Sequence, residues 1–278
     1  MVSILSMICM AFSALVPLAL LIFLVIRCMG RCHTGIKPIL VGAAAFFVFA
    51  LFLEQLLHTF VLHQVPSITS NPLLYAAYGG IAAGVFEETG RLVGFRFLLN
   101  KNSQWEQGVA YGLGHGGLEL VCIGGLLAIT EGQSFYYSIQ INNGSFSQVI
   151  ANAKDVPLQQ SNLRMIQQQL TSSPAWEFLM GGLERVFALA IQIALSLVVL
   201  YAVSKRKYIF YALAVFLHAA VDFTAAYLNR IQVPAPVIEG IVAVFAGIAL
   251  FAIFRMKPLF TGGGELPHKL PKEVKRAD

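Results

Sequence analysis

The amino-acid sequence predicts an all-α fold, a polytopic membrane helical bundle with about seven transmembrane helices. Of its 278 residues, 57% are hydrophobic and only 12% are charged, whereas a soluble domain carries about a quarter charged residues. Apolar runs of about twenty residues, the length that a bilayer-crossing helix needs, recur along the chain. We find no internal repeat and no second soluble domain, so residues 1–278 are expected to form a single membrane-embedded domain.

The expected spans are taken in chain order. The first is interpreted as a membrane helix rather than a signal peptide, because no basic region precedes it and its apolar run is too long. Pro38, Pro72 and Pro174 lie at or near segment starts, where proline disturbs a helix least. The seven apolar runs cover residues 3–26, 38–62, 72–99, 107–129, 175–203, 208–228 and 236–254.

The basic residues predict the orientation. Thirteen of the 19 lysines and arginines follow the first, third, fifth and seventh spans, and only Lys154, Arg164 and Arg230 lie on the other side. By the positive-inside rule the N-terminus is expected outside and the basic tail, about residues 255–278, in the cytoplasm. The protein is thus expected in the cell membrane. The net charge of +5 does not indicate nucleic-acid binding, since the basic residues form no single patch.

The only long loop covers about residues 130–174, on the expected outer side. It is rich in Gln, Asn and Ser, yet apolar residues recur in it at loosely helical intervals. This pattern predicts short amphipathic helices lying on the outer leaflet.

Four cysteines give no disulfide framework. Cys28, Cys32 and His33 resemble a haem or zinc motif, but three residues separate the cysteines where haem attachment needs two. No second ligand pair follows, so we interpret this segment as a juxtamembrane turn.

The stretch Phe86–Arg91 places charges inside the third apolar run. Helical spacing lets Arg91 reach both Glu87, four residues earlier, and Glu88, three residues earlier. Carboxylates in hydrocarbon are costly, and an ionisable group inside a membrane usually marks a functional site. The alternative is a buried ion pair that fixes helix packing.

Two histidines each have an acidic residue four positions later, on the same helical face. His115 precedes Glu119 in the fourth span, and His218 precedes Asp222 in the sixth. Counted from the expected cytoplasmic ends at 1.5 Å per residue, Glu87 and both histidines lie about 15–18 Å deep. This shared depth predicts one site, in which Glu119 and Asp222 orient their histidines.

These residue types favour water-dependent hydrolysis. His115, His218 and Glu87 are a suitable ligand set for a divalent metal, with zinc (Zn2+) the leading candidate, and a second glutamate beside them can act as general base. Without a metal, a glutamate and His115 could activate water while His218 stabilises an oxyanion. The sequence leaves open which of Glu87 and Glu88 is the base.

Two further charged pairs are less clear. Glu54 and His58, four apart, approach the outer end of the second span and are either functional or an interfacial pair. Glu184 and Arg185 in the fifth span either form a structural pair or line an outer cavity.

At these positions the chain resembles the glutamate-dependent intramembrane proteases, a group that includes CAAX prenyl endopeptidases and PrsW proteases. Their pattern is a Glu-Glu pair followed by Arg or Lys, then a His, then a His with Asn or Asp four residues later. The Gly-His-Gly-Gly run and the Glu-Arg pair look most like the YhfC family of intramembrane metalloproteases. The residues carrying the resemblance are Glu87, Glu88, Arg91, His115, His218 and Asp222, with Glu119, Glu184 and Arg185.

The resemblance implies an endopeptidase in which Glu87 or Glu88 and His115 activate water, assisted by His218 and Asp222. Its substrate would be a membrane protein or a lipidated peptide in the lipid bilayer. Arg91 follows the glutamate pair with two intervening residues, as in the PrsW type, whereas CAAX endopeptidases have three, which argues against prenyl-protein processing.

Two other functions use the same residues. Intramembrane Glu, His, Asp and Arg also build relays in proton- or ion-coupled transporters, although inverted repeats or broken helices, which many transporters have, are not evident here. A non-catalytic membrane scaffold or immunity protein is the third possibility.

Overall fold

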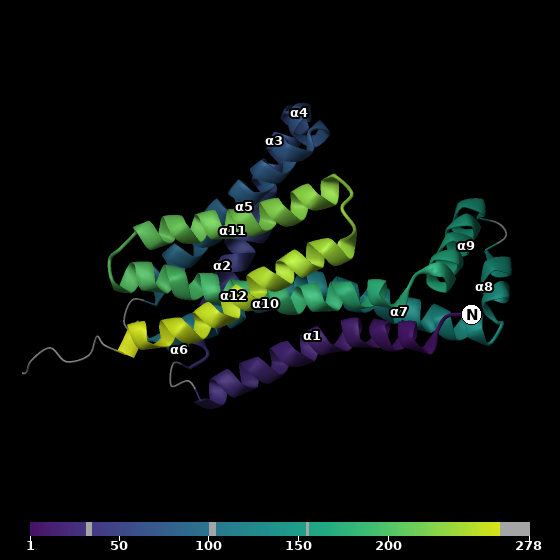
Figure 1. Ribbon diagram of the computed structural model, residues 1–278, viewed down its shortest axis with the longest axis horizontal. Coiled ribbons are helices and arrows are strands. Elements are labelled where there is room, and N and C mark those ends of the chain that lie inside the picture. Colours follow the sequence, from purple (N-terminus) through teal and green to yellow (C-terminus); the bar gives the residue numbers. More distant parts are fainter. Residues whose placement is uncertain (32–34, 100–103, 154–155, 262–278) are drawn as a thin grey trace, which may run out of the picture.

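The computed structural model describes residues 1–31, 35–99, 104–153 and 156–261, and over these ranges the chain is helical and contains no strand (Figure 1). The prediction of an all-α, polytopic membrane protein is confirmed. The helices of the N-terminal half are α1 (Ile4–Arg31), α2 (Lys37–Phe46), η1 (Phe47–Glu54), α3 (Gln55–Gln64), α4 (Pro66–Ser70), α5 (Pro72–Val93), η2 (Gly94–Leu98), α6 (Trp105–Glu119) and η3 (Leu120–Gly124). Those of the C-terminal half are α7 (Gly125–Asn142), α8 (Phe146–Asn152), α9 (Pro157–Ser172), α10 (Ala175–Ser204), α11 (Ile209–Arg230) and α12 (Ala235–Thr261).

Six helices in the described ranges are long and apolar enough to cross a membrane: Ile4–Gly30, Lys37–Gln64, Trp105–Asn142, Ala175–Ser204, Ile209–Arg230 and Ala235–Phe260. The expected third span, residues 72–99, is not among them. It folds into the 22-residue α5 and the short η2, and its buried glutamates and arginine make it more polar than the others. Six such spans therefore replace the seven expected, and a membrane-crossing α5 stays a prediction.

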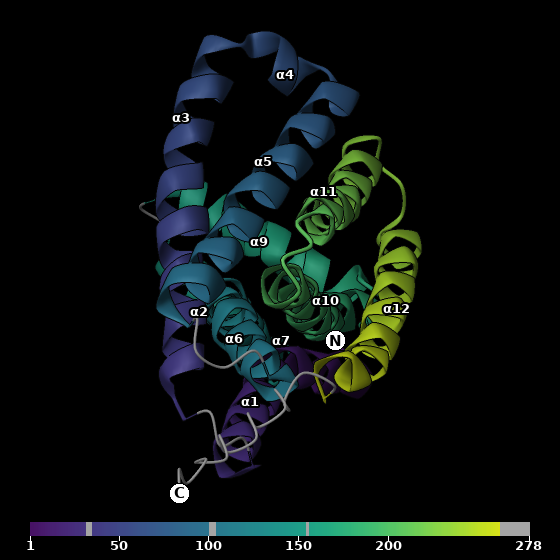
Figure 2. The ribbon, with the colours of Figure 1, turned by 90° about the vertical axis from the view of Figure 1, so that its left-hand side faces the viewer.

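Helix α10 lies near the centre of the bundle. Seen end-on in Figure 2, it is surrounded by α1, α6, α11 and α12. Helix α5 packs most extensively against α11, and α2 packs against α6. This arrangement brings the expected site residues of α5, α6 and α11 to the same side of α10.

Local sequence explains where α5 begins. The side chain of Asn71 accepts hydrogen bonds from the backbone N–H groups of Leu73 and Leu74, at 2.9 and 3.2 Å. Pro72 occupies the first turn, where its missing N–H costs nothing. Helix α5 therefore starts at a defined residue, which fixes the angular position of its glutamates.

Three π-helical turns interrupt the bundle helices in the described ranges, and each adjoins charged residues singled out in the sequence. η1 ends at Glu54, η2 follows Arg91 by three residues, and η3 begins directly after Glu119. Such turns add a residue to a helical turn and are frequent at functional sites.

Glycines allow the helices around the site to approach closely. A Cβ on Gly114 of α6 would lie 1.9 Å from the carbonyl oxygen of Ile39 in α2. A Cβ on Gly84 of α5 would lie 2.6 Å from the carbonyl oxygen of Val215 in α11. Both distances are too short for any side chain, so these glycines set the spacing of the helix pairs that carry His115, Glu87 and His218.

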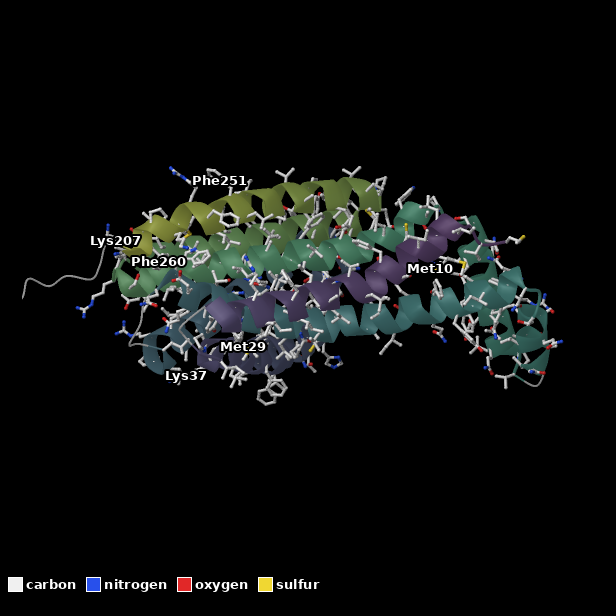
Figure 3. All side chains as sticks on the ribbon, turned by 90° about the horizontal axis from the view of Figure 1, so that it is seen from below. Met10, Met29, Lys37, Lys207, Phe251 and Phe260 are labelled. Carbon is white, nitrogen blue, oxygen red and sulfur yellow. The ribbon has the colours of Figure 1, made fainter. Side chains whose placement is uncertain are left out.

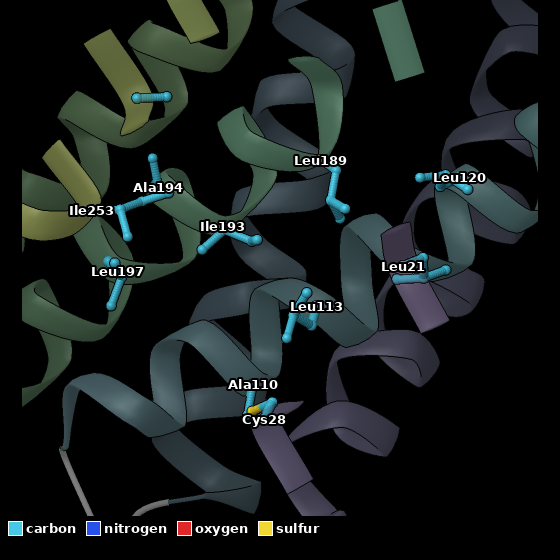
Figure 4. Packing of buried hydrophobic residues seen from close by; sticks show 11 residues of the cluster. Leu21, Cys28, Ala110, Leu113, Leu120, Leu189, Ile193, Ala194, Leu197 and Ile253 are labelled. Carbon is cyan, nitrogen blue, oxygen red and sulfur yellow. The ribbon is translucent and has the colours of Figure 1, made fainter. Parts of the chain in front are cut away.

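An apolar core joins α1, α6, α10 and α12 (Figure 4). Leu113 from α6, Ile193 and Leu197 from α10, and Leu21 from α1 are all buried there. Cys28 is buried in the same cluster, as part of α1 rather than of the expected turn. Cys32 and His33 lie outside the described residues.

The expected outer loop is more helical than predicted. Helix α7 continues to Asn142 instead of ending near Ile129, and α8 and α9 follow it. We call residues 130–172 the distal unit, because it projects from one end of the bundle (Figure 1). Asn142 holds it to the start of α1, donating to the Val2 carbonyl at 3.0 Å and accepting from the Val2 N–H at 2.8 Å.

The labelled residues of Figure 3 identify the two ends of the bundle. Lys37, Lys207 and Phe260 lie toward one end, and Met10 lies toward the other, where the distal unit projects (Figure 3). The ends of α10 and α12 thus lie toward the same end of the bundle as the start of α2.

Candidate active site

The two adjacent glutamates of α5 lie in the protein interior together with Arg91. Glu88 and Arg91 are fully buried and Glu87 is 7% exposed. The Arg91 guanidinium donates a hydrogen bond to Glu88 Oε1 and lies 3.7 Å from Glu87 Oε2. One cation therefore faces both carboxylates, with the i+3 and i+4 spacing that the sequence predicts.

Helix α10 supplies the remaining partners of Arg91. Its Nε donates to Ser196 Oγ at 3.2 Å, and a second guanidinium nitrogen donates to Gln192 Oε1. The amide nitrogen of Gln192 donates in turn to Glu87 Oε2 at 3.3 Å and to Glu119 Oε2 at 2.6 Å. Gln192 thus links three charged side chains, and the sequence interpretation missed it.

A signal for Gln192 was present. Gln192 and Ser196 are polar residues in an otherwise apolar run, and they follow Arg185 by seven and eleven residues. These spacings place all three on one helical face. A search restricted to ionisable groups overlooks such a face.

His115 of α6 contacts Glu87 directly. Its Nε2 lies 2.9 Å from Glu87 Oε2. The ring packs edge-on against Phe46, with the ring centroids 5.1 Å apart, and stacks on Tyr111. Its Nδ1 is buried and has no hydrogen-bond partner within the described ranges. The imidazole is therefore held by aromatic packing and directed at a single carboxylate oxygen.

His218 of α11 contacts both glutamates. Its Nδ1 lies 2.7 Å from Glu88 Oε1, and its Nε2 lies 3.8 Å from Glu87 Oε2. Asp222 Oδ2 is 3.6 Å from the same Nε2, too far for a hydrogen bond. The orienting partner of His218 is thus Glu88 on the neighbouring helix, and Asp222 stands on the opposite side of the ring.

The two histidines converge on Glu87. Because both Nε2 atoms contact the same Oε2, at 2.9 and 3.8 Å, they can lie no more than about 7 Å apart. This is well inside the distance of roughly 10 Å beyond which a common zinc site would be excluded. The shared depth inferred from the sequence thus corresponds to a single cluster.

The donor types in this cluster suit a divalent metal. Two imidazole nitrogens and a carboxylate oxygen face one another, and the other nitrogen of His218 is bonded to a carboxylate, as zinc-binding histidines commonly are. Within the described ranges, however, no group of three His, Cys, Asp or Glu side chains is close enough to enclose a metal ion. The residue types suit a divalent metal, but in this arrangement the side chains lie too far apart to enclose one.

A small cleft of about 100 Å³ opens beside the cluster, between α10, α11 and α12. It is lined by His218 and Asp222 of α11 and by Glu184, Arg185 and Gln192 of α10. The sequence left open whether Glu184 and Arg185 form a pair or line a cavity. They do both, because they are hydrogen-bonded to each other and also line the cleft.

Glu119 does not hold His115 as the i+4 spacing suggested. Its carboxylate accepts from Gln192 at 2.6 Å and lies 3.7 Å from Arg185 Nη1. Glu119 lines the cleft with Gln192 and Arg185 instead.

Glu54 and His58 lie on another side of the cluster. His58 Nε2 is 3.1 Å from Glu54 Oε1, and its Nδ1 is 2.9 Å from the hydroxyl of Tyr78. Glu54 is buried and near enough to Glu87 to interact with it electrostatically. A purely interfacial pair does not explain that burial.

Comparisons with known proteins identify the family of this chain. The sequence profile described as "YhfC intramembrane metalloprotease" matches residues 12–245. A protein of Bacillus subtilis (strain 168) described as "Uncharacterized membrane protein YhfC" is 38% identical over 265 residues, which covers 94% of this chain and 100% of the relative. No solved structure matches significantly. The matched region contains every residue of the cluster, and the chain belongs to the YhfC intramembrane metalloprotease family.

Proposed function

We propose that the protein is an intramembrane endopeptidase that hydrolyses a peptide bond in or near the bilayer. The observation that supports it best is the convergence of His115 and His218 on one oxygen of Glu87, beside a cleft. A buried ion pair that only fixed helix packing would not need two histidines at one carboxylate oxygen, nor a cleft beside them. The substrate would be a membrane protein or a lipidated peptide.

Glu87 is the better candidate for the general base. Its Oε2 faces both histidines, whereas Glu88 is fully buried and engaged by Arg91 and His218. In this scheme Glu87 removes a proton from a water molecule while the oxygen of that water attacks the peptide carbonyl. The C–N bond then breaks, the proton passes to the leaving amine, and the products are a carboxylic acid and an amine.

The histidines and Glu88 have separate roles in the scheme. Nε2 of His115 or His218, when protonated, donates to the oxyanion that forms on the attacked carbonyl. Glu88 fixes the ring of His218 through Nδ1, and Arg91 holds both glutamates in place. Asp222, at the cleft, faces the side of His218 that substrate would approach.

A metal would be held by His115, His218 and Glu87, with zinc the ion that such ligands favour. When bound, it would polarise the carbonyl and lower the pKa of a coordinated water. Two carboxylates opposed by one arginine leave one negative charge unbalanced, which either a divalent cation or a protonated imidazole would offset.

The test uses the full chain purified in detergent. We expect cleavage of a library of transmembrane peptides and about one equivalent of zinc by elemental analysis. His115→Ala and His218→Ala should each remove both, and the double variant should be no worse than either single one, because the two act as a unit. Ion flux in proteoliposomes without cleavage would favour a transporter, and the absence of both activities would favour a scaffold.

We also propose that the N-terminus is outside and the C-terminus cytoplasmic, as the basic residues indicate. Reporter fusions at Lys101, Lys205 and Lys272 should report the cytoplasm, and a fusion at Lys154 should report the outside. A cytoplasmic signal from Lys154 would overturn this orientation.

A further inference from the structure

A second cavity, unrelated to the glutamate–histidine cluster, lies at the Lys207 end of the bundle. It has a volume of about 650 Å³ and is lined by Arg96, Phe97, Val203, Arg206 and Tyr208. These residues come from η2, the end of α10 and the turn that leads into α11. None of them contacts the candidate active site, so the cavity needs its own explanation.

Arg96 is held in this cavity by aromatic residues. Its guanidinium donates a hydrogen bond to the hydroxyl of Tyr208 and lies 5.7 Å from the ring centroids of both Phe97 and Tyr208. These contacts restrict the side chain yet use only part of its five donors. The remaining N–H groups stay available to a ligand.

Arg206 adds a second positive charge from an uncommon backbone conformation. Its φ is 55°, in the left-handed region that residues other than glycine seldom adopt. Within the described ranges, neither Arg206 nor Arg96 forms an ion pair with a carboxylate. Two guanidinium groups lining one cavity repel each other, so an anion between them is favourable.

The surroundings of the cavity are apolar and exposed. Phe97 is 64% exposed and Ile209 is 73% exposed. Leu213 and Phe216 continue this exposed apolar surface along α11. In a membrane protein such a surface faces acyl chains, so the two arginines stand where hydrocarbon meets the polar headgroups.

We propose that this cavity binds the phosphate of an anionic phospholipid, whose acyl chains lie along Phe97 and α11. Arginine presents paired N–H donors that match phosphate oxygens. Basic residues beside a membrane helix attract anionic lipids. A free phosphate shares the headgroup chemistry but would leave the adjoining apolar surface without an occupant.

The test uses the delipidated full chain in detergent and three probes: phosphatidylglycerol, phosphatidylcholine and glycerol 3-phosphate. Native mass spectrometry counts bound lipid, and thermal unfolding gives the stabilisation. Phosphatidylglycerol should bind and raise the unfolding temperature, while the other two probes should have much weaker effects. Arg206→Gln and Arg96→Gln should each weaken apparent phosphatidylglycerol affinity about fivefold, the effect of one basic residue near an anionic surface.

Arg255→Gln is the matched control, because Arg255 is an exposed arginine of α12 outside the cavity. It should bind phosphatidylglycerol as wild type does. Arg206 lies in an exposed turn, so Arg206→Gln should fold even if Arg96→Gln does not. Equal binding of phosphatidylcholine, equal stabilisation by glycerol 3-phosphate, or equal losses in Arg255→Gln and Arg206→Gln would each overturn the proposal.

Discussion

The glutamate–histidine cluster and the distal unit are both helical, but different contacts hold them together. In the cluster, charged side chains from α5, α6 and α11 are buried and bonded to one another through α10. In the distal unit, one small apolar cluster joins α7, α8 and α9, a second packs α7 and α9 against α1 and α10, and most polar side chains are exposed. Apolar contacts suffice to fold a helical unit, so the cost of the buried charges points to chemistry in the cluster and not in the distal unit.

The largest effect should be the loss of turnover when each of the two glutamates is replaced separately by glutamine. Glu87→Gln should reduce turnover by about 10²–10⁴-fold, because glutamine keeps the shape but cannot take a proton. Glu88→Gln should reduce it by about 10–100-fold, the usual cost of losing a residue that orients a functional histidine. Peptide-cleavage rates of the two purified variants measure the difference.

The unfolding temperature of Glu87→Gln serves as the control and should stay near that of the wild type, whereas Glu88→Gln should unfold at a somewhat lower temperature, because Arg91 then faces only one carboxylate, the more distant one. Equal rate losses in the two variants would remove the distinction between base and orienting residue. Full turnover in both would show that the cluster is not catalytic.

Arg91→Ala should have the next largest effect, on stability. It leaves two buried carboxylates without their cation, and breaking a buried ion pair in this way costs about 3–5 kcal/mol. Arg164→Ala on the exposed face of α9 should change the free energy of unfolding by less than about 0.5 kcal/mol. Denaturant or thermal unfolding in detergent measures both, and similar losses would contradict the contrast between the two regions.

The sequence predicts the cluster well for a physical reason. A charge within a long apolar run is costly, so Glu87, His115 and His218 stand out against their surroundings, and counting helical turns places them at one depth. The structure brings these three together, with Arg91 at the spacing expected. No structural contact tests their catalytic roles, which remain proposals.

What the sequence could not predict depends on contacts between helices. Gln192 is a neutral residue whose importance lies in partners from two other helices. Glu119 takes its partners, Gln192 and Arg185, from α10 rather than from its own helix. The polar sequence of the distal unit concealed the length of α7, whose second half is stabilised by packing against α1.

Gly114→Ala should have an intermediate effect. The new Cβ would meet the backbone oxygen of Ile39, which cannot rotate away, so α2 and α6 must separate. We expect a loss of about 1–3 kcal/mol, typical of overpacking, and reduced turnover, because His115 follows directly. Gly79→Ala, with nothing within 4 Å of its new Cβ, is the control and should be neutral or slightly stabilising. Equal stability of the two variants would show that this close contact does not constrain the helices.

The smallest effect on catalysis should come from the distal unit. Leu163 is buried against Phe146 and Ile150, so Leu163→Ala should loosen α8 and α9 by about 2–3 kcal/mol. Because these helices lie at the end of the bundle, the loosening should stay local. Limited proteolysis within residues 130–172 should accelerate, while unfolding of the bundle stays unchanged and cleavage of a short peptide changes by less than about twofold.

Leu158→Ala on the same helix is the control, since Leu158 is 74% exposed, and it should alter neither measurement. If Leu163→Ala instead abolished cleavage in a protein whose bundle still unfolds normally, the distal unit would be part of the catalytic machinery.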